Sequence, residues 1–271
     1  MDMAIIPVFY MNAVASIGVR QGEYIAWIGT GFFIYRKIPG QDRVMPMLIT
    51  NKHVLAGEQS VVIRMKSKDD EKLHIIDVPL YQDDQPIYRQ HSDPDIDIAV
   101  IRIDGTYLRE RHIEFNGFDI DNNALSSPEL RDAGVDEGSL IYMLGFPMGM
   151  VNVNDTLPIC RLGCIARISD AQICESHNLL ADIQNFPGNS GSPIITRPEM
   201  VSIEGTKSLD RAVLAGIVHS YIPYTERLIN QQTNKLVELR SENSGIALVH
   251  PVEYIREVVD DIFTVASGNA T

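Results

Sequence analysis

The stretch FPGNSGSPII, residues 186–195, places two glycines, an asparagine, two serines and a proline immediately before two isoleucines. Proline, glycine, asparagine and serine are the residues most common in turns, so one interpretation is a polar turn that leads into a buried strand. The other interpretation is chemical. Gly188 and Gly191 flank Ser190, a spacing that lets the backbone turn tightly around one hydroxyl and direct nearby N–H groups at a substrate oxygen.

A serine nucleophile needs a general base, because its hydroxyl is nearly unreactive near neutral pH, and histidine is the usual base. His53 follows the apolar strand in LITNKHVLAG, residues 48–57, and lies just before a loop. A histidine at a strand end is more often structural than catalytic, so this position alone does not decide. The other six histidines lack this setting or lie in late strands: His74, His91, His112, His177, His219 and His250.

The base in turn needs a carboxylate that fixes its tautomer and stabilises the imidazolium. HSDPDIDIAVIRI, residues 91–103, supplies Asp93, Asp95 and Asp97 before a buried strand. Asp97 directly precedes the apolar IAVI, so its carboxylate is expected to reach the interior beside His53. Most such acidic clusters are solvated turns, and we assign Asp93 and Asp95 to one.

Short apolar runs of strand length, rich in Val and Ile, recur along the chain without amphipathic helices between them. This pattern is typical of an all-β sandwich or barrel. The end of the chain differs, because Val252, Ile255, Val259 and Ile262 repeat at helical spacing. They predict a closing helix over residues 251–263.

Two long polar segments interrupt the apolar runs. Residues 109–138 are predicted to be a linker between two halves of the fold. Residues 225–245 are predicted to form an extended hairpin or loop, and Leu236, Val237 and Leu239 are expected to hold it down against the rest of the protein.

Length and composition fit one large domain or two lobes that share an interface: 271 residues, 45% apolar and 22% charged. The formal net charge of −13 argues against a nucleic-acid partner, for which a basic face is expected. No segment beyond the N-terminal run approaches the length of a transmembrane helix, so no membrane partner is expected.

The N-terminal run, residues 1–19, contains AVAS, which is similar to a signal-peptidase site. However, Asp2 makes its start negative, and Pro7 and Asn12 interrupt it. We therefore expect a cytoplasmic protein whose first strand buries three residues: Val14, Ile17 and Val19.

Three cysteines, Cys160, Cys164 and Cys174, form an odd set without a disulfide framework, which fits a reducing compartment. Together with His177 they offer the ligands of a structural zinc site. Their spacing is not that of a zinc knuckle, and free cysteine is often buried as a small hydrophobic residue. We favour cysteines of the core and expect no cofactor, with the zinc site as the alternative.

His53, Asp97 and Ser190 occur in that order along the chain. The chymotrypsin β-barrels have the same order, whereas α/β-hydrolases have the order Ser, Asp, His. Three motifs resemble those of trypsin-like proteases around the histidine, aspartate and serine: TNKHV at 50–54, DIAV at 97–100 and GNSGSP at 188–193. The resemblance runs from about Val14 to the closing helix.

Further motifs are similar to those of the bacterial HtrA/Deg-like branch: GTGFFI at 29–34, LGFPMG at 144–149 and Asn189 before the serine. Two departures stand out. Members of this branch usually carry a PDZ domain after the protease, and we expect none here. Ser192 replaces the second glycine of the branch's GNSGG, which is expected to be tolerated only if the backbone there does not need glycine.

The resemblance implies an all-β fold of two six-stranded antiparallel β-barrels with a C-terminal helix. The expected divisions are an N-terminal barrel lobe over residues 1–115 with His53 and Asp97, a C-terminal barrel lobe over residues 116–250 with Ser190, and the helix over residues 251–263.

The resemblance also implies a serine endopeptidase whose Gly188 and Ser190 N–H groups form an oxyanion hole. Each such donor stabilises the transition state by on the order of 3 kcal/mol in other enzymes. Five residues are implied to line the specificity pocket: Gln184, His219, Ser220, Tyr221 and Gly245. None of the five is acidic, so strict cleavage after Arg or Lys is not expected. Asn189 stands where an aspartate would be needed for an ion pair with a newly cut N-terminus, so activation by that route is not expected either.

Two functions therefore stay open. One is a serine endopeptidase that acts on a protein or peptide substrate, and the other is a catalytically silent trypsin-like module that binds an extended peptide of a partner protein by strand addition. The complete set of His53, Asp97 and Ser190 favours the enzyme. Because such a protease needs restraint, we also expect a regulatory protein partner or the substrate to order residues 225–245 beside the pocket.

Overall fold

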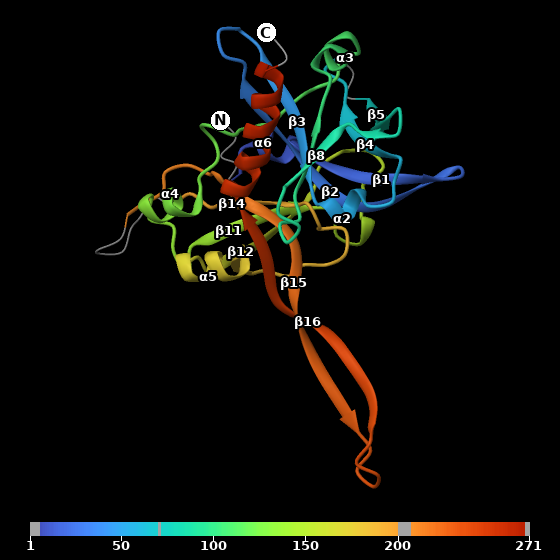
Figure 1. Ribbon diagram of the computed structural model, residues 1–271, viewed down its shortest axis with the longest axis vertical. Coiled ribbons are helices and arrows are strands. Elements are labelled where there is room, and N and C mark those ends of the chain that lie inside the picture. Colours follow the sequence, from blue (N-terminus) through green and yellow to red (C-terminus); the bar gives the residue numbers. More distant parts are fainter. Residues whose placement is uncertain (1–5, 70–71, 200–206, 269–271) are drawn as a thin grey trace.

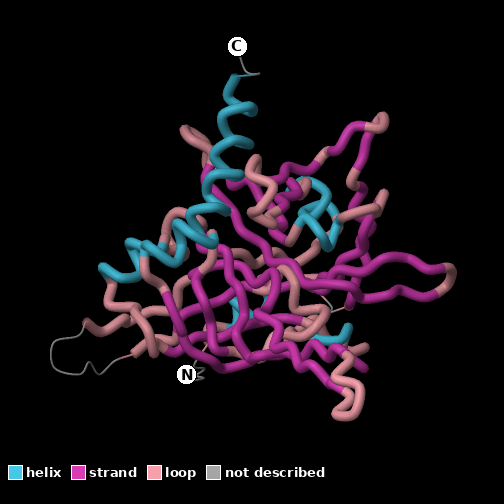
Figure 2. The backbone as a smooth tube through the Cα atoms, turned by 60° about the horizontal axis from the view of Figure 1, so that its bottom comes forward, coloured by secondary structure: helices cyan, strands magenta, loops and turns pink. Residues whose placement is uncertain are grey.

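Strands are the main regular structure of the molecule, and helices are few (Figures 1 and 2). The computed structural model describes residues 6–69, 72–199 and 207–268. The described strands form two main sheets, one from each half of the chain, and a small two-stranded sheet of β6, Tyr81–Gln82, and β7, Gln85–Pro86. No helix within the described ranges is both long and apolar enough to cross a membrane.

The N-terminal half forms an eight-stranded sheet in the order β5-β4-β1-β2-β3-β9-β8, with β10 paired to β2. Its strands are β1 Val14–Gln21, β2 Tyr24–Lys37, β3 Val44–Thr50, β4 Ser60–Lys66, β5 Leu73–Pro79, β8 Tyr88–Gln90, β9 Ala99–Arg102 and β10 Phe118–Asp119. The expected first strand is confirmed, since Val14, Ile17 and Val19 are buried on β1.

This sheet differs from the six-stranded barrel expected for the N-terminal half. The additional strands are β8, with three residues, and β10, with two. Strands this short carry no alternating pattern that sequence periodicity can detect. Strand β10 also pairs in parallel with β2, in an otherwise antiparallel sheet.

The C-terminal half forms a closed six-stranded barrel in the order β11-β12-β13-β16-β15-β14, as expected. Its strands are β11 Leu140–Gly145, β12 Ile159–Arg167, β13 Leu179–Asp182, β14 Pro193–Thr196, β15 Leu214–Ile229 and β16 Leu236–Pro251. Strand β11 is an apolar run because it is buried on both faces: Ile141 and Met143 pack in the barrel interior, and Leu144 packs in the cluster between the two halves.

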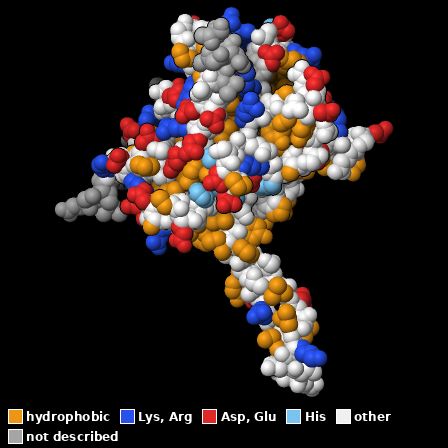
Figure 3. Space-filling view, in the orientation of Figure 1, with side chains coloured by type: hydrophobic (Ala, Val, Ile, Leu, Met, Phe, Trp, Pro, Cys, Tyr) orange, Lys and Arg blue, Asp and Glu red, His pale blue; other side chains and the backbone are white. Residues whose placement is uncertain are grey.

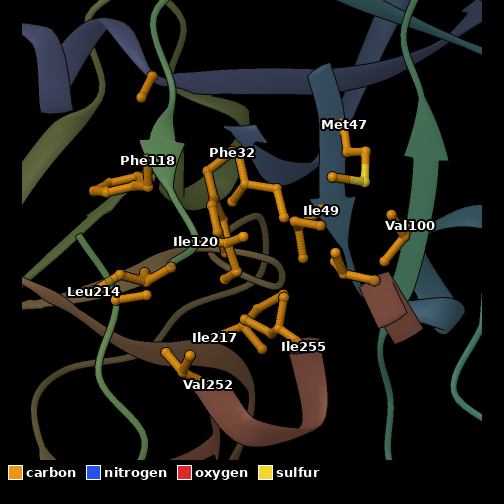
Figure 4. Close-up of a cluster of buried hydrophobic side chains, with 14 of the residues drawn as sticks. Phe32, Met47, Ile49, Val100, Phe118, Ile120, Leu214, Ile217, Val252 and Ile255 are labelled. Atoms are coloured by element: carbon orange, nitrogen blue, oxygen red, sulfur yellow. The ribbon is translucent and has the colours of Figure 1, made fainter. Parts of the chain in front are cut away.

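A large hydrophobic cluster joins the two halves (Figure 4). It combines Phe32 and Ile49 from the N-terminal sheet with Leu214 and Ile217 from the barrel. The last helix, α6 Val252–Gly268, contributes five buried residues to the same cluster: the four predicted ones, Val252, Ile255, Val259 and Ile262, and Val258. The predicted closing helix is therefore confirmed, and it extends beyond residue 263.

The shorter helices lie in the connections. They are α1 Val8–Asn12, α2 Lys52–Leu55, α3 Gly105–Glu110, α4 Ser127–Asp132, the 3₁₀ turn η1 Pro147–Gly149 and α5 Asp170–Ser176. The segment predicted as a linker, residues 109–138, is thus partly regular, because it contains β10 and α4. Ser126 and Glu129 form a capping box at the start of α4.

Strands β15 and β16 continue beyond the barrel as a two-stranded arm, which points away from the rest of the molecule (Figure 1). The pairing runs from Tyr224↔Glu242 to Ile229↔Leu236. Leu236, Val237 and Leu239 are 53%, 67% and 58% exposed, and hydrophobic side chains are visible along the arm in Figure 3. The hairpin is as predicted, but the expectation that these residues hold it down was wrong, because the arm leaves the barrel instead of folding back.

Candidate active site

His53 and Asp97 lie where two neighbouring strands meet the same edge of the N-terminal sheet. Strand β3 ends at Thr50 and pairs there with Ala99, the first residue of β9. The His53 Nδ1 atom lies 2.5 Å from Asp97 Oδ2, and the His53 backbone N–H donates to Asp97 Oδ1 at 3.1 Å. Each carboxylate oxygen therefore has its own partner on the same histidine.

Electrostatics keep this carboxylate ionised. Burial alone raises the pKa of Asp97, but hydrogen bonds from the His53 ring and backbone, together with the charge that this ring carries when protonated, outweigh burial and hold the pKa below its ordinary value. An ionised carboxylate only accepts hydrogen bonds, so Nδ1 of His53 carries the proton. The neutral ring then has its lone pair on Nε2, and the ring is half-exposed.

The loop that carries Ser190 is shaped by backbone hydrogen bonds. The Asn189 N–H donates to the Phe186 carbonyl at 3.0 Å, and the Ser192 N–H donates to the Asn189 carbonyl at 2.9 Å. Gly191 has a φ of +89°, and a Cβ there would lie 1.9 Å from the Thr30 carbonyl oxygen. Only glycine fits this combination of a left-handed backbone and close approach.

Contacts with β2 and β3 dock this loop onto the N-terminal sheet. The Thr30 N–H donates to the Ser190 carbonyl at 2.8 Å, and the Thr50 hydroxyl donates to the Thr30 carbonyl at 2.8 Å. Because Thr50 is three residues before His53, these bonds place Ser190 near the His53–Asp97 pair. No hydrogen bond joins the Ser190 hydroxyl to His53 within the described residues, and such bonds are often long in ligand-free sites.

Two backbone N–H groups of the loop have no acceptor in the described part of the chain. The Pro187 carbonyl accepts from the Met148 N–H at 2.5 Å, so in this trans peptide the Gly188 N–H points the opposite way. The Asn189 carbonyl accepts a hydrogen bond from the Ser192 N–H. Because the carbonyl and the N–H of a trans peptide point in opposite directions, the Ser190 N–H points away from Ser192. Both N–H groups are thus available to an oxygen outside the loop.

The side chains of Asn189 and Ser192 lie on the inner side of the loop. Asn189 is 1% exposed, and its amide makes no hydrogen bond among the described residues. Ser192 is also buried, and its φ is not in the left-handed region, which satisfies the condition expected for replacing glycine. The loop therefore keeps its shape through backbone bonds and not through an ion pair at position 189.

A family model described as the trypsin-like peptidase domain matches residues 29–200. The chain belongs to this family. The match begins within β2, continues past the end of β14, and includes His53, Asp97 and Ser190. No curated protein matches the chain.

Solved structures with the same fold include the MamO protease domain from Magnetospirillum magneticum in its apo form and an atomic-resolution structure of HBP. The MamO domain is 13% identical, with a TM-score of 0.50, covering 92% of this chain and 96% of that one. HBP is 14% identical, with a TM-score of 0.51, covering 94% of this chain and 93% of that one. These similarities show the chymotrypsin-like fold.

In this trypsin-like peptidase domain, the residues expected to line a specificity pocket lie on the parts of β15 and β16 that are nearer the barrel and in the segment before the serine loop. Gln184 is exposed, and its amide nitrogen lies 3.6 Å from the place of a Cβ on Gly245. Tyr221 is half-buried on β15, and the half-buried Ser220 receives a hydrogen bond on its carbonyl from Asn185 at 2.9 Å. Gln184 and Gly245 are thus neighbours.

His219 belongs to a group of histidines beside Asp97 that sequence reasoning did not assemble. Its Nε2 lies 2.7 Å from Asn178 Oδ1, and its ring stacks on His250 with centroids 4.0 Å apart and planes at 5°. The Nε2 atom and one face of the His219 ring therefore contact other protein groups. His250 is fully buried and contacts the backbone of Asp97.

The cysteines do not occupy the core positions expected of them. Cys160 and Cys174 are exposed and Cys164 is half-buried, because the first and third lie on outward positions of β12 and α5. Although Cys160 as a residue is exposed, its thiol is partly shielded from solvent, and this desolvation raises the pKa of Cys160. Within the described ranges, no three side chains among His, Cys, Asp and Glu converge as metal ligands.

Proposed function

We propose that the protein is a serine endopeptidase in which Ser190 is the nucleophile, His53 the general base and Asp97 the residue that orients it. The observation that carries this proposal is the 2.5 Å pair of His53 Nδ1 and Asp97 Oδ2, at the sheet edge where the Ser190 loop docks. The Nδ1–H tautomer of His53 leaves Nε2 free to take a proton.

The chemistry follows from these positions. His53 Nε2 removes the hydroxyl proton while Ser190 Oγ forms a bond to the scissile carbonyl carbon, and the electron pair moves to the carbonyl oxygen. The N–H groups of Gly188 and Ser190 stabilise that oxyanion. His53 then gives its proton to the leaving amine as the C–N bond breaks, and water releases the acyl group from Ser190 by the same steps.

For the substrate, we propose a protein or peptide whose side chain is received by Gln184, Ser220, Tyr221 and Gly245, together with the backbone of His219. None of these residues is acidic, which supports a preference other than Arg or Lys. The motifs GTGFFI and LGFPMG support a relation to the HtrA/Deg-like branch, and the odd cysteine set supports a cytoplasmic location.

A fluorophosphonate probe tests the proposal directly, because it reacts only with a serine that its site activates. The wild-type protein should be labelled and should cleave members of a peptide library, and Ser190→Ala should do neither. If wild-type protein is not labelled but binds extended peptides, the chain is the silent binding module and not the enzyme.

A further inference from the structure

A buried imidazole lies directly behind the proposed catalytic carboxylate. His250, near the end of β16, is 0% exposed. Its Nε2 atom lies 3.0 Å from the backbone nitrogen of Asp97, and its Nδ1 atom lies 2.9 Å from the carbonyl oxygen of His177. The ring thus bridges the turn before β9 and the segment after α5.

The two partners fix the protonation of this ring. A carbonyl oxygen only accepts hydrogen bonds, so Nδ1 of His250 must carry a hydrogen. A backbone N–H only donates, so Nε2 must have its lone pair free toward Asp97. Only the neutral ring with hydrogen on Nδ1 meets both conditions, and a protonated ring would direct an N–H against the N–H of Asp97.

Groups from four further segments surround the ring. His219 of β15 stacks on it, Tyr254 of α6 packs edge-on at 6.2 Å between centroids, and His177 and His91 approach from the segments after α5 and β8. Farther out, Glu257 contacts His91 at 2.8 Å, and Asp93 lies 4.0 Å from His177.

The neutral form of His250 is the favoured one in these surroundings. Burial is the largest influence on the pKa of His250, and together with the neighbouring histidines it lowers this pKa to about 4, although the His177 carbonyl and the Asp97 carboxylate act in the opposite direction. His250 therefore stays neutral at physiological pH.

We propose that His250 is a positioning residue: by accepting the Asp97 N–H, it fixes the backbone of Asp97 and thereby aims the carboxylate at His53. The opposite side of Asp97 is held as well, since the Asn51 amide donates to the Asp97 carbonyl at 2.7 Å. The proposal rests on the proposed function, because it concerns the aspartate of the same site.

The first test needs no variant and no activity. Long-range ¹H–¹⁵N correlation spectra of the wild-type protein distinguish the two neutral tautomers and the imidazolium. His250 should show a protonated Nδ1 and a bare Nε2 from pH 8 down to about pH 5. A protonated Nε2 in that range overturns the proposal, whether or not the protein cleaves peptides.

The second test compares His250→Ala with His250→Gln, and His74→Gln serves as a control because His74 is half-buried on β5 in the other half of the protein. In His250→Ala, kcat should fall on the order of tenfold to a hundredfold with little change in KM. The low-field proton signal of the His53–Asp97 hydrogen bond should weaken. In His250→Gln, the amide oxygen can accept the Asp97 N–H, so these properties should be partly restored.

A folded His250→Ala protein with an unchanged kcat and an unchanged low-field proton signal overturns the proposal. If His250→Ala does not fold, the tautomer measurement and His250→Gln decide. A wild-type protein that shows neither labelling nor turnover contradicts the proposed endopeptidase function, while the spectra still decide the role of His250 toward Asp97.

Discussion

Thr30 and Ser190 are joined across the interface between the two halves of the protein, because the Thr30 N–H donates to the Ser190 carbonyl at 2.8 Å. The hydroxyl of the same threonine donates to the Gly188 carbonyl at 2.7 Å and accepts from the Phe146 N–H at 3.1 Å. One residue of β2 thus holds both the serine loop and the loop after β11. The position of Ser190 relative to His53 consequently depends on Thr30.

Thr30→Val should therefore disturb the site without changing the shape of the side chain. It leaves the Gly188 carbonyl and the Phe146 N–H buried without a partner, which costs about 1–3 kcal/mol. Urea unfolding should show this loss of stability, and fluorophosphonate labelling should slow. Thr106→Val is the matched control, because Thr106 is exposed and its hydroxyl accepts a hydrogen bond at the surface, from Arg109. Equal behaviour of the two variants would contradict the role given to Thr30.

Gly191→Ala should be far more damaging than the same change at Gly40. Both glycines have positive φ, +89° and +73°, so both substitutions carry the strain of a left-handed backbone, about 1–2 kcal/mol. Only at Gly191 does the new Cβ meet a backbone oxygen, 1.9 Å away, whereas Gly40 has nothing within 4 Å. Gly191→Ala should lose labelling and much of its stability. Similar melting temperatures for the two variants would show that the loop can move away from Thr30.

Ser190→Ala, His53→Ala and Asp97→Asn should each abolish most peptide hydrolysis while leaving the melting temperature close to that of the wild type. Asp97→Asn should lower kcat by about 10⁴-fold, because an amide at that position favours the wrong tautomer of His53. Double variants should lose little more than single ones, since the three groups act as a unit. Full turnover by Ser190→Ala would remove the nucleophile assignment.

Much of this site could be predicted from sequence because each of its motifs is local. Apolar runs end at Thr50 and begin after Asp97, and these two strand ends meet once β3 pairs with β9. Even the helix α4 had a local signal, the capping box of Ser126 and Glu129, which the interpretation of residues 109–138 as a linker overlooked.

The supporting contacts could not be predicted, because they join residues distant in sequence. His250 and Asp97 are 153 positions apart, and Thr30 and Gly188 are 158 apart. Nothing in the composition around His250 distinguishes it from an ordinary residue at a strand end. The exposure of Leu236 and Leu239 could not be predicted from the sequence either, because apolar residues on a strand suggest burial. Only the three-dimensional course of β15 and β16 shows that the arm leaves the barrel.

Stability should decrease as the pH falls from about 6.5 to 5. Burial lowers the pKa of His219 to about 3 and that of His250 to about 4, both below the ordinary value of 6.5. Between these values the unfolded chain binds protons that the folded protein does not, so stability rises with pH, by at most about 1.4 kcal/mol per pH unit for each histidine.

Carboxylates with a lowered pKa also make stability decrease as the pH falls, but they do so at lower pH than the histidines. The pKa of Asp97 is lowered, and that of Glu129 is lowered to about 2 by the Ser126 backbone and by Arg256, so their stabilisation is lost only below about pH 4.5. The pH dependence of urea unfolding between pH 7 and 5 should thus measure the contribution of His219 and His250 to stability. His250→Gln should flatten the pH dependence and His74→Gln should not. A slope that is the same in all three proteins would show that His250 is not neutral in the folded state.

The arm should be the least stable strand pair of the protein. A two-stranded hairpin is marginal in water, and here Tyr224, Leu228 and Ile229 are exposed together with the leucines and valine of the opposite strand. The inner ends of the same strands carry Tyr221 and Gly245, so order in the arm is linked to the shape of the proposed pocket. We expect a partner or substrate to provide that order.

In hydrogen exchange, the amides of residues 225–245 should exchange at rates close to those of an unfolded chain, whereas those of β11 to β13 should be strongly protected. An active-site fluorophosphonate should slow exchange in this segment if the arm and the pocket are coupled. A variant in which Asn-Gly replaces residues 225–241 tests whether the arm influences the pocket. If it does, the turnover of this variant on short peptides should differ from that of the full chain. Strong protection of the free arm together with ordinary turnover on short peptides would show that the site is already formed, and restraint of the enzyme would then have to act elsewhere.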